Sequence, residues 1–132
     1  MPPLQDEVRE LLEGPNFGHV ATTLPDGCPH TVAVWVGIEG DHVVFFTQTG
    51  SRKARNLARD PRVAISIVDG ANPYRGANLR GRVVGTVEGD EALEIIDRLS
   101  EKYTGQPFPM RSGVVFRVAV DRAWSMTLPF EH

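Results

Sequence analysis

The sequence has a single cysteine, Cys28, and no long apolar run. One cysteine cannot form an internal disulfide bond, and no charged segment followed by a long apolar stretch opens the chain. The richest apolar region is interrupted by Gly37, Glu39, Gly40 and Asp41, so it falls short of the roughly 20 residues that a bilayer-spanning helix needs. We therefore expect a cytoplasmic protein that does not enter the membrane.

Positive charge is scarce as well. The 132 residues contain 14 Lys and Arg against 17 Asp and Glu, which gives a net charge of -3. We do not expect nucleic-acid binding, because the chain is acidic and its one basic cluster lacks interleaved aromatic residues. The four histidines show no metal-ligand spacing, so no metal site is predicted. The length and the 41% hydrophobic content fit one domain spanning residues 1–132.

What the sequence does contain is a series of short strand-like segments with a few helical ones. Apolar residues at helical spacing predict helices over residues 4–13 and 91–103. Runs rich in β-branched and aromatic residues, separated by turn residues, predict six strands over 17–24, 31–38, 42–49, 62–68, 79–88 and 114–120.

The connections between the first three strands are short. Pro25-Asp26-Gly27 and Glu39-Gly40-Asp41 are long enough for hairpins but too short for parallel crossovers, so these strands should form a meander. Short antiparallel strands avoid exposed edges by closing on themselves. The predicted fold class is therefore mainly β with a few α-helices, as a six-stranded antiparallel barrel.

Two of the predicted strands are apolar on both faces. In residues 31–36, Thr31, Ala33 and Trp35 share one face and three valines share the other; residues 43–49 have a similar pattern. One face can fill the barrel, and the other needs a second cover. A bound planar ligand or a second subunit would provide it, and we expect a homodimer. Trp35 fits either core packing or the wall of a ligand cleft.

The segment after the third strand has the features of an anion site. Ser51 is a favourable N-cap, so the free amides of the first helical turn would point toward the space beside Gly50. Arg52 and Lys53 add positive charge there, and the predicted guest is a phosphate. Arg55, like Arg59 farther along the helix, is better explained as part of a solvated basic face.

A larger ordered pattern carries a resemblance to a known family. Its pieces are Gly18-His19-Val20-Ala21-Thr22-Thr23-Leu24, Asp26-Gly27-Cys28-Pro29-His30, Val34-Trp35-Val36, Phe46-Thr47, Ser51-Arg52-Lys53-Ala54-Arg55-Asn56-Leu57 and Asp60-Pro61-Arg62-Val63. Together these segments resemble the pyridoxamine-phosphate-oxidase-like split-barrel flavoproteins, and more narrowly the deazaflavin-dependent oxidoreductases of that superfamily. The resemblance implies a split β-barrel of the FMN-binding type that forms a homodimer.

The resemblance also implies a cofactor site. An aromatic-Thr pair and the following Ser-Arg-Lys hold the cofactor phosphate in that superfamily, the second-strand backbone lies along the flavin ring, and the strand that carries Asn78 and Arg80 reaches toward the partner's cofactor. The full set implied to contact the cofactor is Thr31, Val34, Trp35, Val36, Phe46, Thr47, Gln48, Ser51, Arg52, Lys53 and Asn78. No catalytic side chain is predicted, since such a cofactor supplies the reactivity itself.

The chain departs from the true oxidases at two of these positions. Those enzymes have an arginine and a lysine where this sequence has Thr31 and Val36, and their C-terminal substrate motif is absent. We therefore expect a reductase that transfers a hydride from reduced deazaflavin coenzyme F-420 to a small conjugated or heterocyclic substrate. An FMN-dependent oxidase or flavin reductase of the same fold, and a non-catalytic flavin or deazaflavin carrier, remain the alternatives.

Overall fold

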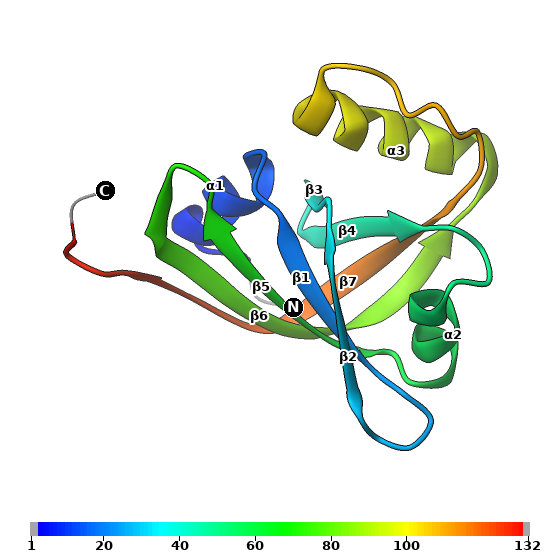
Figure 1. Ribbon diagram of the computed structural model, residues 1–132, viewed down its shortest axis with the longest axis horizontal. Helices are drawn as coiled ribbons and strands as arrows, with labels where there is room; N and C mark the ends of the chain where they lie inside the picture. Colours follow the sequence, from blue (N-terminus) through cyan, green and yellow to red (C-terminus); the bar gives the residue numbers. More distant parts are fainter. Residues whose placement is uncertain (1–2, 131–132) are drawn as a thin grey trace.

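A computed structural model describes residues 3–130 of the chain. Within this range the helices are α1 (Asp6–Glu13), α2 (Arg52–Arg59) and α3 (Gly89–Thr104). The strands are β1 (Gly18–Thr23), β2 (Pro29–Val34), β3 (Gly37–Glu39), β4 (His42–Thr47), β5 (Arg62–Asp69), β6 (Asn72–Val87) and β7 (Val114–Thr127). Figure 1 shows the strands as one curled sheet, with α3 and α2 near the end where β4 meets β7.

The seven strands pair antiparallel in the order β2-β1-β5-β6-β7-β4-β3. The two predicted hairpins are confirmed, since β1 pairs with β2 and β3 pairs with β4. The predicted meander is wrong, because β2 and β3 lie at opposite edges of the sheet. The predicted count of six strands is also wrong, because the run over 31–38 breaks at Trp35 and Val36 into two strands.

This break explains why the sheet curls. Only Trp35 and Val36 separate the two edge strands in the chain. Three consecutive Cα steps of about 3.8 Å hold the end of β2 and the start of β3 within about 11 Å of each other. The edges are therefore drawn together, but in residues 3–130 they are not hydrogen-bonded to each other, so the predicted closed barrel is not formed.

Side chains of helix α3 form hydrogen bonds with the backbone groups that the break leaves without strand partners. The Val36 amide donates to the Tyr103 hydroxyl at 3.0 Å, and that hydroxyl donates to the Asn16 carbonyl at 2.6 Å. Lys102 donates from Nζ to the Leu12 carbonyl at 2.9 Å and to the Val36 carbonyl. Because buried backbone groups are costly when unpaired, these contacts fix the position at which the strand is interrupted.

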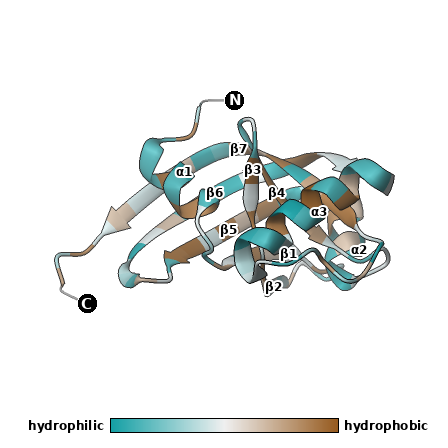
Figure 2. Ribbon diagram, turned by 90° about the horizontal axis from the view of Figure 1, so that it is seen from above, coloured by the Kyte–Doolittle hydropathy of each residue, from teal (hydrophilic) through white to brown (hydrophobic). Residues whose placement is uncertain are grey.

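The hydrophobic core has two parts. Val32, Val34 and Val36 face the main cluster inside the curled sheet, where α1 also packs. A second cluster lies between α3 and the outer face of β4 and β7. Figure 2 shows the apolar residues concentrated along strands and on one side of the helices. The second apolar face of β4 is thus covered by α3, which corrects the expectation that a ligand or a second subunit covers it.

The buried environment of Lys102 makes stability depend on pH. Desolvation lowers its pKa from 10.5 to about 8, and the nearby Glu13 carboxylate opposes this effect. Between these two values the unfolded chain retains a proton that the folded chain has lost, so the free energy of unfolding should increase as pH rises through this window. We expect urea unfolding from pH 7.5 to 9.5 to show this increase in the wild type and a smaller one in Lys102→Met. Parallel curves for the two proteins would contradict the assignment.

Candidate functional site

The junction between β4 and α2 is fixed by a short hydrogen-bond chain. Gly50 has a φ of +82°, which turns the chain into the helix. The Ser51 hydroxyl accepts from the Ala54 amide at 3.1 Å, so the predicted N-cap is confirmed. Thr47 at the end of β4 donates from its hydroxyl to the Ser51 hydroxyl at 3.0 Å. The first-turn amides of α2 are thereby held at the end of β4, with the positive end of the helix directed outward.

A pocket of about 290 Å³ lies beside this junction, lined by Phe17, Ala33, Val34, Trp35, Phe46, Lys53 and Phe108. Its walls are largely aromatic. Trp35 stacks on Tyr103 with ring centroids 5.4 Å apart, and it meets Phe108 edge-on at 5.9 Å. Phe46 also meets Phe108 edge-on, at 5.2 Å. Flat, interlocked rings of this kind can line one side of a planar apolar group.

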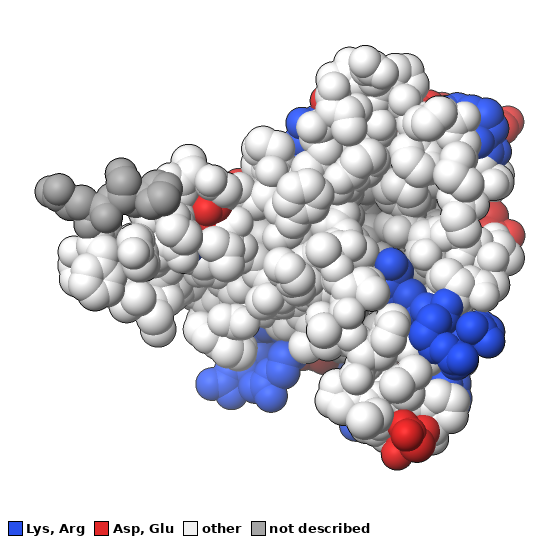
Figure 3. All heavy atoms as spheres, viewed as in Figure 1, with Lys and Arg blue, Asp and Glu red and all other residues white. Residues whose placement is uncertain are grey.

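Lys53 is the charged residue of this pocket. Its side chain is half-buried, and desolvation lowers its pKa. No ion pair or hydrogen bond involves its ammonium group within residues 3–130. Figure 3 shows basic side chains gathered over α2 beside a hollow of the surface. A cation that is partly desolvated and lacks a counter-ion is a favourable place for an anionic group.

The orientation of α2 separates Lys53 from its neighbour Arg52. Asn56 and Leu57 are the buried residues of the helix, and Lys53 precedes them by three and four positions, so it lies on the same inward face. Arg52 is exposed and lines a different hollow, with Leu24, Pro25 and Asp26. The helical spacing of Lys53 with these two residues was the signal in the sequence that distinguishes the two cations.

The other predicted residues are distributed over several places. Thr31 and Asn78 line a hollow of about 260 Å³ that also contains Trp124. Val36 is fully buried in the core. Gln48 exchanges hydrogen bonds with Ser112: its amide donates to the Ser112 carbonyl at 3.0 Å, and the Ser112 hydroxyl donates to its side-chain oxygen at 3.1 Å. One pocket therefore unites four of the predicted residues, which are Val34, Trp35, Phe46 and Lys53.

Sequence reasoning missed two aromatic residues of this pocket, Phe17 and Phe108. Phe108 lies in an irregular segment after α3, where no periodicity marks a side chain as facing inward. Its position is fixed by its own amide, which donates to the Asp97 carboxylate at 3.1 Å, and by Arg111, which pairs with the same carboxylate at 2.9 Å. These partners are more than ten positions apart in the chain, so local patterns do not reveal them.

Residues 3–130 contain no group of three or more His, Cys, Asp or Glu side chains placed to hold a metal ion. In the same range, no helix has the length and apolar character to cross a bilayer.

The chain is similar to one known protein family and to several solved structures. Residues 4–127 match a family model described as pyridoxamine 5'-phosphate oxidase. A solved F-420 reductase is 32% identical with a TM-score of 0.80, and the match covers 92% of this chain and 98% of the reductase. A conserved hypothetical protein from Mycobacterium tuberculosis is 29% identical with a TM-score of 0.81, over 100% of this chain and 92% of that one.

Curated relatives match over a shorter range. A pyridoxine/pyridoxamine 5'-phosphate oxidase from Kineococcus radiotolerans is 34% identical over 83 residues, which is 63% of this chain. The matched segments span about a third of the length of the curated oxidases, at 31% and 35%.

Proposed function

Because this chain belongs to the pyridoxamine 5'-phosphate oxidase family, we propose that it is an oxidoreductase that uses the deazaflavin coenzyme F-420. Its substrate would be a small conjugated or heterocyclic compound. The observation that carries the proposal is Lys53, a half-buried cation in a pocket walled by aromatic rings, for which the described part of the chain supplies no counter-ion. The match to an F-420 reductase over nearly the whole length of both chains supports this choice of cofactor.

The residues of the site suit an anionic cofactor with a planar ring. Lys53 and the amides at the very start of α2, before the capped Ala54 amide, would hold the phosphate, because they combine a formal charge with free donors. Trp35, Phe46 and Phe108 would line the ring and keep water away from it. The bound coenzyme would supply the hydride that reduces the substrate. The protein then has to position the two reactants, and it needs no nucleophile of its own.

The size of the pocket fits a site that encloses the ring system of the cofactor and leaves its tail outside. At about 290 Å³ it is at the lower end of the range of ligand sites, which suits a ring system and not a whole coenzyme. A longer anionic tail would have to lie outside the pocket, over the exposed basic surface of α2 (Figure 3). Arg52 and Arg55 are exposed there, where they could contact such a tail.

The FMN-dependent function is the second candidate. It is favoured by the 34% identity to a curated pyridoxine/pyridoxamine 5'-phosphate oxidase. The same pocket and the same lysine would serve FMN, whose phosphate is also anionic. Against oxidation of pyridoxamine phosphate itself stand Thr31 and Val36, which are neutral and of which Val36 is fully buried.

We also propose that the active form is a homodimer and that it acts in the cytoplasm. Within one chain, Thr31 and Asn78 line a different hollow from Trp35 and Lys53. A second copy is the simplest way to bring both groups of residues to one cofactor, in line with the symmetric dimers that soluble proteins most often form.

Titration of the purified protein with F-420 and with FMN tests the proposal. Quenching of the coenzyme fluorescence should give a dissociation constant at least tenfold lower for F-420 than for FMN, because the longer anionic tail has the basic surface of α2 available to it. Tighter binding of FMN would transfer the assignment to the second candidate. If reduced F-420 binds but is not oxidised by any of a panel of quinones, enones and tetrapyrroles, the protein is a carrier and the reductase assignment is wrong.

A further inference from the structure

We propose that Tyr103 is a positioning residue that holds Trp35 and Phe17 in place as two walls of the aromatic pocket. The role rests on the proposed cofactor site and goes beyond it, because Tyr103 is not among the described residues that line the pocket. Both wall residues lie outside the strands: Phe17 precedes β1, and Trp35 lies in the break between β2 and β3. Strand pairing therefore does not fix either ring directly.

The Tyr103 ring contacts both wall rings. Its centroid is 5.4 Å from that of Trp35, with the planes 9° apart, and 5.5 Å from that of Phe17, at a tilt of 33°. Lys102 approaches the same ring, with its Nζ 4.8 Å from the centroid. Aromatic pairs of this kind add stabilisation beyond the area that they bury. The ring is thus a common support for two wall residues that the local chain does not bring together.

The Tyr103 hydroxyl connects the backbone beside each wall residue. It accepts from the Val36 amide at 3.0 Å, next to Trp35, and donates to the Asn16 carbonyl at 2.6 Å, next to Phe17. Burial raises the pKa of Tyr103, which keeps the donated proton on the hydroxyl. Because a buried backbone group that loses its partner is costly, this hydroxyl ties the two segments together.

Asn16 provides a fixed point for this connection. Its side-chain amide donates to the Leu11 carbonyl in α1 at 2.9 Å, and its side-chain oxygen accepts from the Gly70 amide at 2.8 Å. The segment that contains Asn16 is therefore held to α1 and to the turn between β5 and β6 by its own side chain. Through its carbonyl, Tyr103 is attached to this fixed point.

The backbone at the break between β2 and β3 depends more strongly on α3. The Val36 amide is bound by Tyr103, and the Val36 carbonyl is bound by Lys102. Phe46, on another side of the pocket, is instead held in β4 by its pairing with β7. Loss of the Tyr103 hydroxyl should therefore displace Trp35 and leave Phe46 in place.

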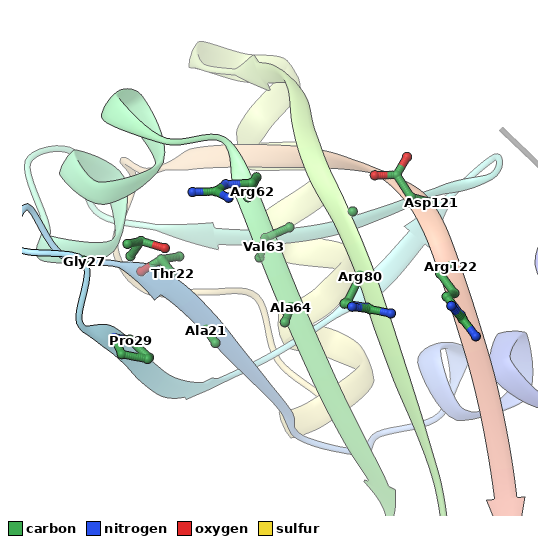
Figure 4. A pocket seen from close by; sticks show the side chains of 12 residues that line it. Ala21, Thr22, Gly27, Pro29, Arg62, Val63, Ala64, Arg80, Asp121 and Arg122 are labelled. Atoms are coloured by element: carbon green, nitrogen blue, oxygen red, sulfur yellow. The ribbon is translucent and has the colours of Figure 1, made fainter.

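This kind of support is specific to the aromatic pocket. A larger hollow of about 780 Å³ lies over β1, β5, β6 and β7 (Figure 4). Most of its lining residues belong to strands, such as Ala64 of β5 and Arg80 of β6, so sheet pairing fixes its walls. None of the described residues that line it is aromatic. The aromatic pocket has two walls that pairing does not fix, and a side chain from α3 holds them.

The fluorescence of Trp35 tests the inference without any cofactor. Trp124 is the other tryptophan of the sequence, so Trp124→Phe leaves Trp35 as the single reporter. In this background, Tyr103→Phe should raise the acrylamide quenching constant of Trp35 and shift its emission to longer wavelength, because the ring is no longer held. Tyr74→Phe is the matched control, since it removes the other tyrosine hydroxyl of the sequence from a residue outside the pocket lining, and it should change neither quantity.

Binding of F-420 gives the functional readout. Tyr103→Phe should weaken it by about three- to tenfold, as expected when one hydrogen bond that holds the pocket is lost. Lys53→Gln should also weaken binding but leave the quenching of Trp35 unchanged, because Lys53 acts on the phosphate. A wild type that does not bind F-420 would contradict the proposed function, and the quenching comparison would still decide the role of Tyr103.

Two results would overturn the inference. The first is a Tyr103→Phe protein that has a lower thermal midpoint but the same Trp35 quenching as its parent, since the residue would then be structural only. The second is measured on the wild type and needs no variant to fold: the Val36 amide should exchange slowly with deuterium although it lies outside the strands. Exchange as fast as in the unfolded chain would mean that the Tyr103 hydroxyl does not hold this backbone.

Discussion

Gly81→Ala is expected to lower the free energy of unfolding by about 3 kcal/mol or more, as overpacking against rigid backbone does at its upper end. A Cβ atom at this position would lie 2.1 Å from the Ala119 carbonyl oxygen and 3.0 Å from its carbonyl carbon. The obstacle is backbone, so no change of side-chain rotamer relieves it. The strands β6 and β7 would have to separate at the β-bulge that Asp121 forms in β7, with loss of hydrogen bonds in the most extensive strand pairing of the sheet.

Gly85→Ala is the matched control for this prediction. Gly85 lies in the same strand, and a Cβ atom there would meet nothing within 4 Å. Its φ is also not in the left-handed region. The control should therefore unfold within about 1 kcal/mol of the wild type, and slightly greater stability is the expected direction. Denaturant unfolding of the three proteins gives the comparison. Equal stability of the Gly81 and Gly85 variants would mean that β6 and β7 are not in close contact at the bulge.

The features that sequence reasoning predicted correctly depend on local chemistry. The hairpin turns at Pro25-Asp26-Gly27 and Glu39-Gly40-Asp41, the Ser51 cap and the helical spacing of residues 91–103 are each decided by neighbours a few positions apart. Such preferences are encoded within short windows of the chain, so they can be identified before the fold is known.

The features that were missed depend on distant contacts. The predicted strand over 31–38 has no polar residue after Thr31, and it is interrupted where Tyr103 and Lys102, more than sixty positions away, bind the backbone of Val36. The alternation of apolar and polar residues along a strand cannot indicate such an interruption. The bulge at Asp121 is equally invisible, because Arg122 and Trp124 continue the alternation of the buried valines before it. A change of face is then detectable only from the pairing with β6.

Lys53→Gln is expected to weaken F-420 binding by about 30- to 100-fold, or roughly 2 to 3 kcal/mol, as is typical when a charged group loses its hydrogen-bonded partner. Lys53 is half-buried in the aromatic pocket and makes no competing ion pair with any residue from 3 to 130, so its charge is available to the cofactor. Arg98→Gln is the matched control, because it removes an exposed cation that pairs with Glu39 and does not lie on α2. Arg52→Gln should have a smaller effect than Lys53→Gln, since Arg52 lines a different hollow. A larger loss for Arg52 would move the phosphate away from the pocket.

The pH dependence of this affinity provides an independent check of the same residue. Desolvation lowers the pKa of Lys53 below its usual 10.5 in the free protein. A bound phosphate stabilises the ammonium form and raises that pKa, so binding takes up a proton between the two values. Affinity for F-420 should therefore fall as pH rises through the lowered pKa, and the fall should be absent from Lys53→Gln. If the variant and the wild type lose affinity in parallel, another group controls the titration and Lys53 does not contact the phosphate.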